Sequence, residues 1–576
     1  MHRLRLKHLP LLPTLLVPLT LLGQTTPVQN FGARNWLLQP AGDSTLKNII
    51  VGSAVTAEGK LQNSRDVFLV QPSTGTVRRL TTFSNDPGAT AVSITPDGTG
   101  AAYLGLFNRA GNQTEEVHYL DVATAADRLI ATDLEGCAAP PCLHDLHFSA
   151  DGKKLLWASS KGNPLWVANI DGSAILRLPV TSGRIANSPN VITNDNRLFY
   201  MTDTGPYSIG LDGTSPTPLP YAFANNDLIV SADGRTAAWQ TAYFGRFGFD
   251  YSIQTASTIA NTIGFDSTPY SNLSLSADGT HIAFIHNRQA WTPQQITNFQ
   301  LSDVLDLTLN AAGTKILYST GQTTSNQRAA IWLANSDGTN PKTIFAPTYV
   351  NPNGVIGINS QGLPLALSPG SYFTIYGQNL YPKDEIVTAN FPVSVATNKG
   401  KLPLQAVTPW QINAILPMDT PVGPLTLNIT LADGTQLAAS ATVADSAPAL
   451  ITYTNPATGR QQAAAFHLST LLPCDQQRPA RADEIIETYG FGLGLTDPIQ
   501  SVTVPTPYNP LPRTIAQPTV TIGTQNAQVL YSGLVPTVIG VYQINILIPK
   551  MPSGVYQMKW STGNVTPASQ GAISIQ

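Results

Sequence analysis

The sequence predicts an all-β protein: an N-terminal β-propeller with seven blades, or six as the alternative, followed by two Ig-like β-sandwich modules. Three observations predict this fold class. A strand–turn–strand unit recurs along the first two-thirds of the chain, and the last third contains two matching halves. Charged residues make up only 12% of the chain, against an ordinary share of about 25%, while Gly and Pro number 45 each. Short strands joined by Gly/Pro turns produce such a composition.

Residues 1–23 have the features of a Sec-type signal peptide. A basic start is followed by an apolar run over residues 9–22 and by Gly23; the basic residues are Arg3, Arg5 and Lys7. Prolines interrupt the run, which is shorter than the roughly 20 residues needed to span a bilayer. We therefore expect an exported protein, periplasmic, cell-surface or extracellular, without stable membrane insertion.

The cysteines fit an oxidising compartment. Cys137 and Cys142 bracket the segment CAAPPC, in which two prolines restrict the loop, so a local disulfide is expected. Their spacing is not C-x-x-C, which gives little support for a redox or zinc role. Cys474 remains as a buried free thiol.

The recurring unit is clearest at Leu273–Phe284, LSLSADGTHIAF. Alternating residues give each strand two different faces, and Asp-Gly suits a tight hairpin because glycine accepts positive φ. Successive turns lie 34 to 54 residues apart, a repeat distance typical of propellers. The other copies are Ala91–Tyr103, Leu146–Trp157, Val191–Tyr200, Leu228–Trp239 and Leu305–Tyr318.

These S-A-D-G units resemble the WD40-like repeats of TolB-type propellers, and the likeness covers roughly residues 45–347 of a domain placed at 24–348. Ile49–Thr82 lacks the motif but supplies strands for a seventh blade. That blade would be completed by a strand from the other end of the propeller or from Asn35–Gln39. The motif specifies a fold rather than a function.

The last third is predicted to be a duplication, with modules at 349–446 and 447–576. Ser368–Leu380 matches Ala482–Gly494, and the Gln-Ile-Asn triplet at 411–413 matches the one at 543–545. Each half is expected to form a sandwich of about seven strands. The paired amides of each triplet share one strand face, so we expect them to satisfy backbone groups of a neighbouring loop, with a ligand site as the alternative.

This region resembles the Solibacter-type C-terminal domain family. The segments that carry the likeness are SPGSYFTIYGQNL, TPWQINAILP, PARADEIIETYGFGLG and the run at Pro518–Pro549. One departure is Phe491, where the family usually has Thr. The resemblance implies a secreted modular protein and no particular activity.

Motifs of catalysis are absent from the sequence. It has no G-x-S-x-G, H-E-x-x-H or P-loop, and we interpret Gly490–Gly494 as turn glycines. The formal net charge is −3, so the sequence lacks the excess of basic residues expected of a nucleic-acid-binding protein. No cofactor and no metal are expected, because His144 and His147 fall on opposite strand faces and the repeated Asp residues are a hairpin device.

The best candidate contact surface is the segment Thr241–Tyr251, where aromatic residues surround one arginine. Exposed aromatics bind sugars or form protein hot spots, although packing between blades is the alternative. The candidate binding residues are Tyr243, Phe244, Arg246, Phe247, Phe249 and Tyr251.

These observations predict an exported, non-enzymatic binding protein. Its propeller face would recognise an envelope protein or polysaccharide, and its Ig-like modules would act as a spacer or attachment. A carbohydrate-active enzyme that uses acidic residues in the propeller channel is the alternative, and a purely structural envelope component is a third hypothesis.

Overall fold

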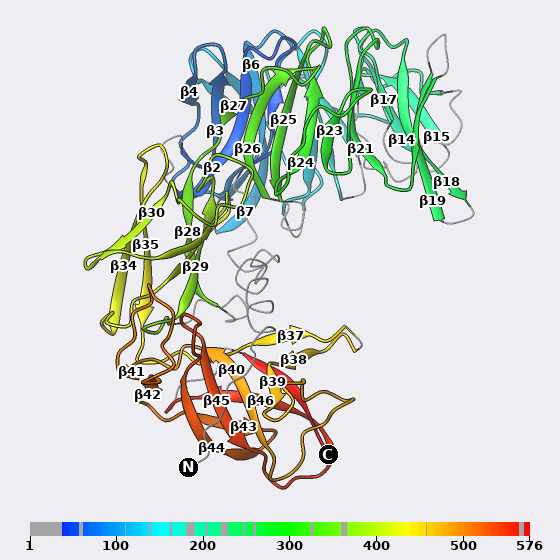
Figure 1. The fold of residues 1–576 in the computed structure, drawn as a ribbon. Helices are drawn as coiled ribbons and strands as arrows, with labels where there is room; N and C mark the ends of the chain where they lie inside the picture. Colours follow the sequence, from blue (N-terminus) through cyan, green and yellow to red (C-terminus); the bar gives the residue numbers. More distant parts are fainter. Residues whose placement is uncertain are drawn as a thin grey trace. The chain divides into compact units, whose positions relative to one another are not determined.

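The computed structural model describes residues 37–576 except 57–60, 110, 138–139, 162–163, 180–190, 203–204, 220–227, 246–247, 257–260, 323–326, 359–365, 457 and 564–568. Every regular element in these residues is a β-strand, which confirms the all-β prediction (Figure 1). Two compact units result, one over Arg34–Pro347 and one containing Thr348–Gln576. The predicted signal peptide lies outside the described residues. Within them, no helix has the length and hydropathy needed to cross a bilayer.

The first unit is a propeller built from seven successive groups of antiparallel strands. Its first groups are β1 (Ala41–Gly42), β2 (Ile49–Val55), β3 (Leu61–Gln71) and β4 (Thr76–Arg79), then β5 (Gly88–Ile94), β6 (Gly100–Arg109), β7 (Asn112–Asp121) and β8 (Asp127–Thr132). The third and fourth are β9 (Leu143–Phe148), β10 (Lys154–Ser159), β11 (Leu165–Asn169) and β12 (Leu176–Arg177), then β13 (Val191–Ile192), β14 (Arg197–Thr202), β15 (Gly205–Gly210) and β16 (Thr217–Pro218).

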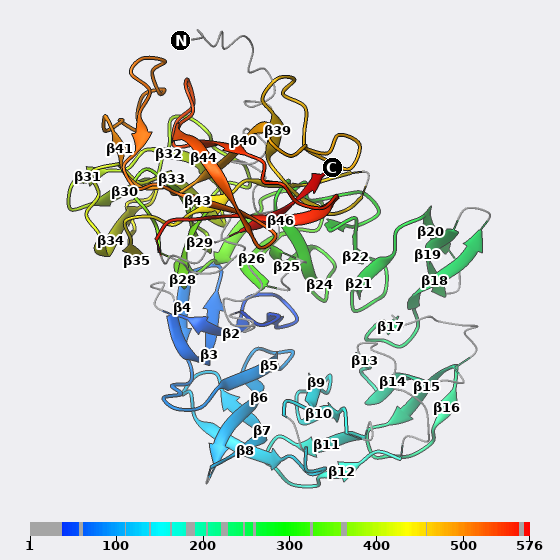
Figure 2. The ribbon, with the colours of Figure 1, turned by 90° about the horizontal axis from the view of Figure 1, so that it is seen from below.

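The fifth group is β17 (Ile229–Val230), β18 (Ala237–Gly245), β19 (Gly248–Ala256) and β20 (Asn261–Asp266), and the sixth is β21 (Tyr270–Leu275), β22 (Ile282–His286) and β23 (Gln289–Trp291). The seventh is β24 (Asp303–Leu309), β25 (Lys315–Gln322), β26 (Gln327–Asn335) and β27 (Lys342–Phe345). A single parallel bridge, Arg65 to Gly88, links the first two groups. Figure 2 shows the groups following one another around a ring, with the first strand of each toward its middle.

The turn between the first two strands of a group has one recurrent set of hydrogen bonds. In the third group the Ser149 hydroxyl donates to Asp151 Oδ1 over 2.6 Å, and the Lys153 amide donates to the same oxygen over 3.0 Å. The Lys154 amide in turn donates to Ser149 Oγ over 2.9 Å. The bond from Ser149 is the largest cause that lowers the pKa of Asp151. These contacts agree with the predicted hairpin role. They recur at Thr95 and Asp97, Ser231 and Asp233, and Ser276 and Asp278.

Two groups build the same turn from other residues. In the seventh group Ala312 stands where the motif has Asp, and Asn310 Oδ1 accepts instead from the amides of Thr314 and Lys315, each over 2.8 Å. In the first group Asp43 accepts from the amides of Thr45 and Asn48, each over 2.9 Å. A short polar side chain at the end of the first strand is therefore the shared requirement.

Backbone hydrogen bonds join these turns from one group to the next. They run from Asn194 N to Ala232 O (2.7 Å), Asp233 N to Ala277 O (3.3 Å), Ala277 N to Ala311 O (2.8 Å), Ala311 N to Ser44 O (2.8 Å) and Ser44 N to Pro96 O (3.0 Å). Proline has no amide hydrogen, so Pro96 accepts a hydrogen bond from the first group but cannot donate one to the third group. The series links six of the seven groups, including the last to the first.

The first group obtains its innermost strand from the preceding residues. The Leu38 amide donates to Gly52 O over 2.8 Å, and β1 pairs with β2. Of the two predicted sources, the segment preceding the group is therefore the one used. Side-chain packing joins the first group to the seventh, since Leu46 and Val51 lie in one buried cluster with Leu317. Lys342 Nζ adds a hydrogen bond to Pro72 O over 3.0 Å.

Gly279 tests how closely the turns approach one another. Its φ is +70°, and a Cβ there would lie 2.4 Å from Thr236 in the fifth group. We expect Gly279→Ala to destabilise the propeller by roughly 2–4 kcal/mol, because the left-handed backbone cost adds to a clash. Urea denaturation with hydrogen exchange of β21 and β22 measures the loss.

Gly75 is a matched control, because its φ is +71° but a Cβ there would meet nothing within 4 Å. Gly75→Ala should cost only about 1 kcal/mol. Equal losses at the two glycines would contradict the close-approach explanation.

The second unit begins with two four-stranded sheets. One orders β28 (Tyr349–Gly357), β29 (Tyr372–Gln378), β33 (Gln411–Ile415) and β32 (Leu404–Val407). The other orders β31 (Gly400–Lys401), β30 (Ser394–Thr397), β34 (Gly423–Thr430) and β35 (Gln436–Val443). Apolar side chains of both sheets, such as Phe373 and Leu427, form one buried core.

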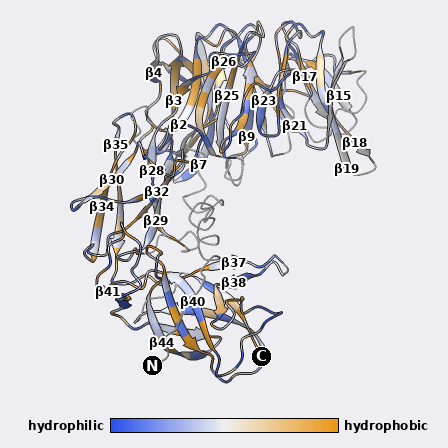
Figure 3. Cartoon of the chain, in the orientation of Figure 1, coloured by the Kyte–Doolittle hydropathy of each residue, from blue (hydrophilic) through white to orange (hydrophobic). Residues whose placement is uncertain are grey.

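The remaining strands form one connected twelve-stranded sheet rather than two separate ones. Its main order is β36 (Ala449–Leu450), β40 (Ile485–Phe491), β45 (Tyr542–Leu547), β44 (Gln525–Leu534), β43 (Thr519–Ile522), β46 (Gly554–Ser561), β47 (Gln570–Ile575), β38 (Gln461–Ala463) and β37 (Thr452–Thr454). The other three strands are β39 (Ala465–His467), β41 (Thr496–Asp497) and β42 (Arg513–Thr514). In Figure 3 the strands of this unit show hydrophobic colours mixed with hydrophilic ones.

The predicted duplication is visible in the strand register. Tyr376 of β29 pairs with Gln411 of β33, and Tyr489 of β40 pairs with Gln543 of β45. The Tyr-Gly and Gln-Ile-Asn segments are therefore neighbouring strands in the same alignment in both halves.

Three of the four amide side chains of the triplets form hydrogen bonds with other side chains, which were not among the predicted partners. Asn413 Oδ1 accepts from the Thr374 hydroxyl over 2.9 Å. At the matching place in the second half, Gln543 donates to Glu487 Oε2 over 3.2 Å and to Asn545 Oδ1 over 2.7 Å. The prediction missed this because Thr374 and Glu487 lie on the neighbouring strand, far away in sequence.

The burial of Glu487 beside the second triplet can be tested by measuring stability at two pH values. Burial raises its pKa, so its protonated form is favoured in the folded state. Protonated Glu487 makes its full contribution to stability below the ordinary glutamate pKa of 4.5. This contribution is lost as the pH rises through the pKa that Glu487 has in the folded protein. We therefore expect Glu487→Gln to be more stable than wild type at pH 8 and equal to it at pH 4, as measured by urea denaturation.

Glu385→Gln is the control, because the Glu385 side chain is 53% exposed. It should change stability equally at both pH values. A Glu487→Gln protein that is less stable than wild type at pH 8 would contradict the interpretation.

Candidate functional sites

The carboxylates of the innermost strands have side-chain partners in their own group or in the preceding one. Asp306 of β24 accepts from the Ser319 hydroxyl over 2.6 Å and from Arg328 Nη2 over 2.9 Å. Asp303 of β24 lies 3.7 Å from Arg288, and Asp145 of β9 lies 2.9 Å from His144. These are the acids on the first strands of the groups within the described residues. Asp303 and Asp306 each have an arginine partner, which makes them poor general acids or bases for a substrate in the channel.

A second polar cluster lies inside the second group, on β6, β7 and the start of β8. His118 is 8% exposed, and its two ring nitrogens lie 2.8 Å from Asp127 Oδ1 and 2.9 Å from Glu116 Oε2. Arg109 binds Glu116 in a bidentate pair, with distances of 2.8 and 3.0 Å. The Tyr103 ring stacks on His118 at 4.8 Å and its hydroxyl donates to Asp127.

This geometry favours an imidazolium at His118. Burial alone would lower its pKa, but the hydrogen bonds to Asp127 and Glu116 outweigh burial and raise the pKa above its ordinary value of 6.5. Both ring nitrogens then donate, each to a carboxylate. Because every member has partners within the second group, the cluster stabilises that group rather than presenting a reactive residue.

We expect His118→Gln to destabilise the protein by about 2 kcal/mol at pH 6 and by less at pH 9. A histidine with a raised pKa makes its full contribution to stability below pH 6.5, the ordinary histidine pKa. This contribution is lost as the pH rises through the pKa of His118 in the folded protein. Urea denaturation at the two pH values measures this difference.

His144→Gln serves as the control, since the His144 side chain is 46% exposed and pairs with its neighbour Asp145. Its effect should be small at both pH values. An equal loss at pH 6 and pH 9 for His118→Gln would rule out the imidazolium.

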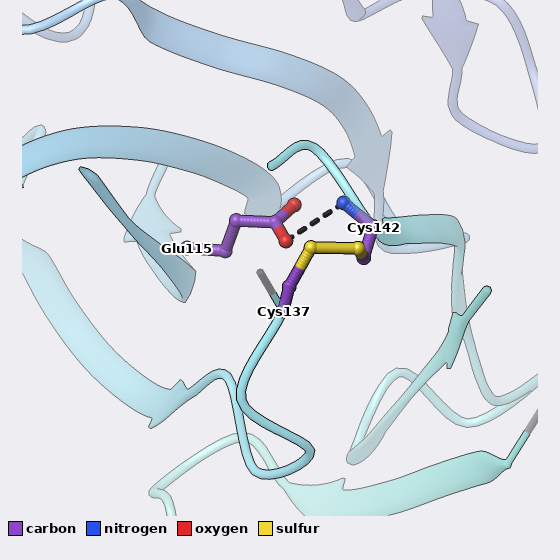
Figure 4. Close-up of side chains that lie close together, drawn as sticks. All are labelled: Glu115, Cys137 and Cys142. Atoms are coloured by element: carbon purple, nitrogen blue, oxygen red, sulfur yellow. Dashed lines mark hydrogen bonds between the residues drawn. A yellow bond between two sulfur atoms is a disulfide. The ribbon is translucent and has the colours of Figure 1, made fainter. Parts of the chain in front are cut away.

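The predicted cysteine pair lies in the segment between the second and third groups. Cys137 and Cys142 are joined by a disulfide, and the buried carboxylate of Glu115 faces it (Figure 4). Glu115 accepts from the amides of Cys142 over 2.7 Å and Leu143 over 2.9 Å. The carboxylate thereby fastens the disulfide segment to β7.

The same three residues are the one group of potential metal ligands that the described residues bring together. The sulfur atoms of Cys137 and Cys142 are bonded to each other in the disulfide, whereas a metal ion is bound by cysteine thiolates. The three residues therefore do not form a metal site while the disulfide is present. Cys474, the third cysteine, is buried and free, and burial raises its pKa. Neither site offers an activated thiol.

The predicted aromatic surface is only partly described. Its backbone forms the hairpin of β18 and β19, in which Phe244 pairs with Phe249. Tyr251 is half-buried and packs against a cluster that contains Tyr270 and Phe284 of the sixth group, as in the packing alternative. The side chains of Tyr243, Phe244, Arg246, Phe247 and Phe249 lie outside the described part, so this surface stays a prediction.

The structure also has an open cleft of about 470 Å³ between the sixth and seventh groups, on the side of the Asp-Gly turns. It is lined by four turns or strand ends, with these residues: Thr280, His281, Ile282, Thr292, Pro293, Gln294, Leu309, Gly313, Ser336 and Asp337. Sequence reasoning missed the cleft because its residues come from separate turns of two groups. One sequence feature could have indicated the cleft. The turn Ser336-Asp337-Gly338, between the third and fourth strands of the seventh group, lies on the same side as the turn between its first two strands.

Comparisons with solved structures find propellers. Oligogalacturonate lyase from Vibrio parahaemolyticus is 15% identical, with a TM-score of 0.36 over 54% of this chain and 92% of that one. The β-propeller domain of the Trilobed protease from Pyrococcus furiosus is 13% identical, with a TM-score of 0.36 over 54% and 97%. TolB from Acinetobacter baumannii is 16% identical, with a TM-score of 0.24 over 52% of each chain.

No protein family matches the chain, and no curated protein matches it. The resemblance of the second unit to the Solibacter-type domain therefore stays a prediction. At the identities above, the likeness to solved structures concerns the fold alone. The propeller assignment stands on the strand order, turns and ring of this chain.

Proposed function

We propose that the protein is an exported, non-enzymatic binding protein whose propeller unit recognises an envelope protein or a polysaccharide. The observation that carries the proposal is the pairing of Asp303 and Asp306 with arginine side chains, which leaves Asp145 as the one acid on the described innermost strands without an arginine partner. Glycoside hydrolysis needs two carboxyl groups that are free to face a substrate. The described innermost strands offer one such carboxyl group rather than two, which favours recognition over turnover.

The finer architecture belongs to the same proposal. The seven strand groups would be seven blades, which the turn-to-turn hydrogen bonds support. The two halves of the second unit would be Ig-like modules that act as a spacer or attachment, and their shared register supports a duplication. Residues 1–23 would direct export to the periplasm, the cell surface or the medium.

A binding experiment on the chain without residues 1–23 tests the function. The chain would be incubated with immobilised soil polysaccharides and with solubilised envelope proteins, and hydrogen exchange would locate any protected peptides. We expect saturable binding with protection in Arg34–Pro347. Protection confined to Thr348–Gln576 would instead favour the structural hypothesis, and turnover of a polysaccharide would favour the enzyme.

A further inference from the structure

In the cleft between the sixth and seventh groups, His281 presents a hydrogen-bond acceptor. The Thr280 hydroxyl uses its proton to donate to Asp278 Oδ1 over 2.8 Å. His281 Nδ1, which lies 2.9 Å from the same hydroxyl, must therefore donate to it. In a neutral imidazole the other nitrogen, Nε2, then carries a lone pair. It can accept from a ligand in the cleft.

The remaining polar groups of the cleft are also free to bind. Asp337 Oδ1 accepts from the amide and hydroxyl of Thr339, over 2.9 and 2.6 Å, while its second oxygen has no partner within the described part of the chain. These bonds lower the pKa of Asp337 and keep it ionised at neutral pH. Over the same described residues, no hydrogen bond engages the side chains of Thr292, Gln294 and Ser336.

The floor of the cleft is apolar. Ile282 and Leu309 are buried, 8% and 7% exposed, and Pro293 lies at the exposed edge. Gly313 makes room for the imidazole, because a Cβ at this position would lie 2.5 Å from the His281 ring. The volume of about 470 Å³ falls within the range of small-ligand pockets, about 300–1,000 Å³.

We infer that this cleft binds a neutral saccharide, and the inference rests on the proposed binding function. A sugar ring offers several hydroxyl donors for Asp337 and His281, and hydroxyl acceptors for the Gln294 amide. Its C–H face can lie on Ile282 and Leu309. An acidic sugar would be repelled by the Asp337 carboxylate.

Calorimetric titration of the chain lacking residues 1–23 tests the site. The probes are methyl glycosides of neutral hexoses, cellobiose, maltose and galacturonate. We expect saturable binding of a neutral probe and at least a tenfold loss of affinity in the double variant Gln294→Ala, Asp337→Asn. Galacturonate should bind more weakly than its neutral counterpart.

Asp212→Asn is the matched control. Asp212 accepts from the amide and hydroxyl of Thr214 over 2.9 and 2.6 Å, as Asp337 does from Thr339, but it lies in the fourth group, outside the cleft. It should bind the neutral probe within twofold of wild type. Thermal unfolding of both variants checks that the fold is intact.

The inference is overturned if no neutral probe binds the wild type, if the double variant binds as well as wild type, or if galacturonate binds more tightly. Each of these outcomes can be told apart from failure of the proposed function. Saturable binding of a polysaccharide or envelope protein with protection elsewhere in Arg34–Pro347 would leave that function standing while removing this site.

Discussion

The hydrogen bonds of the turn after the first strand determine the structure of the propeller unit. A short polar side chain, such as Ser149 or Asn310, holds the backbone where the first strand ends. The same turn places one amide and one carbonyl toward the next group, as in Ala277 to Ala311. Local chain reversal and assembly of the ring thus depend on the same few residues.

This arrangement explains which substitutions the repeat tolerates. Asp is absent in the seventh group, yet the turn forms because Asn310 supplies the acceptor for two amides. Glycine is harder to replace, because it combines positive φ with contact to the preceding group, as Gly279 does with Thr236. Pro96 is accommodated because it needs only to accept. The common element is hydrogen-bonding capacity at given backbone positions rather than residue identity.

Features encoded by neighbouring residues could be predicted from the sequence. The hairpins and the Cys137–Cys142 disulfide depend on contacts that the local pattern specifies, and the duplication of the second unit depends on segments that can be matched directly. The turn at Asp43 was missed because no Asp-Gly marks it. His118 and its partners were missed because Asp127 and Glu116 meet it only across paired strands. The cleft residues have no periodicity at all.

The distribution of charge connects the fold to its use. With so few ionisable residues, the propeller places several of its acids and bases in partnered clusters, such as Asp306 with Arg328 and Glu116 with Arg109 and His118. The side chains of such clusters are held by several partners in one arrangement, which suits rigidity. The cleft differs, because its hydroxyls, amide and single imidazole keep unsatisfied hydrogen-bonding capacity beside an apolar floor. A surface with that chemistry, held on turns that the ring fixes in place, is suited to recognising a polar uncharged ligand.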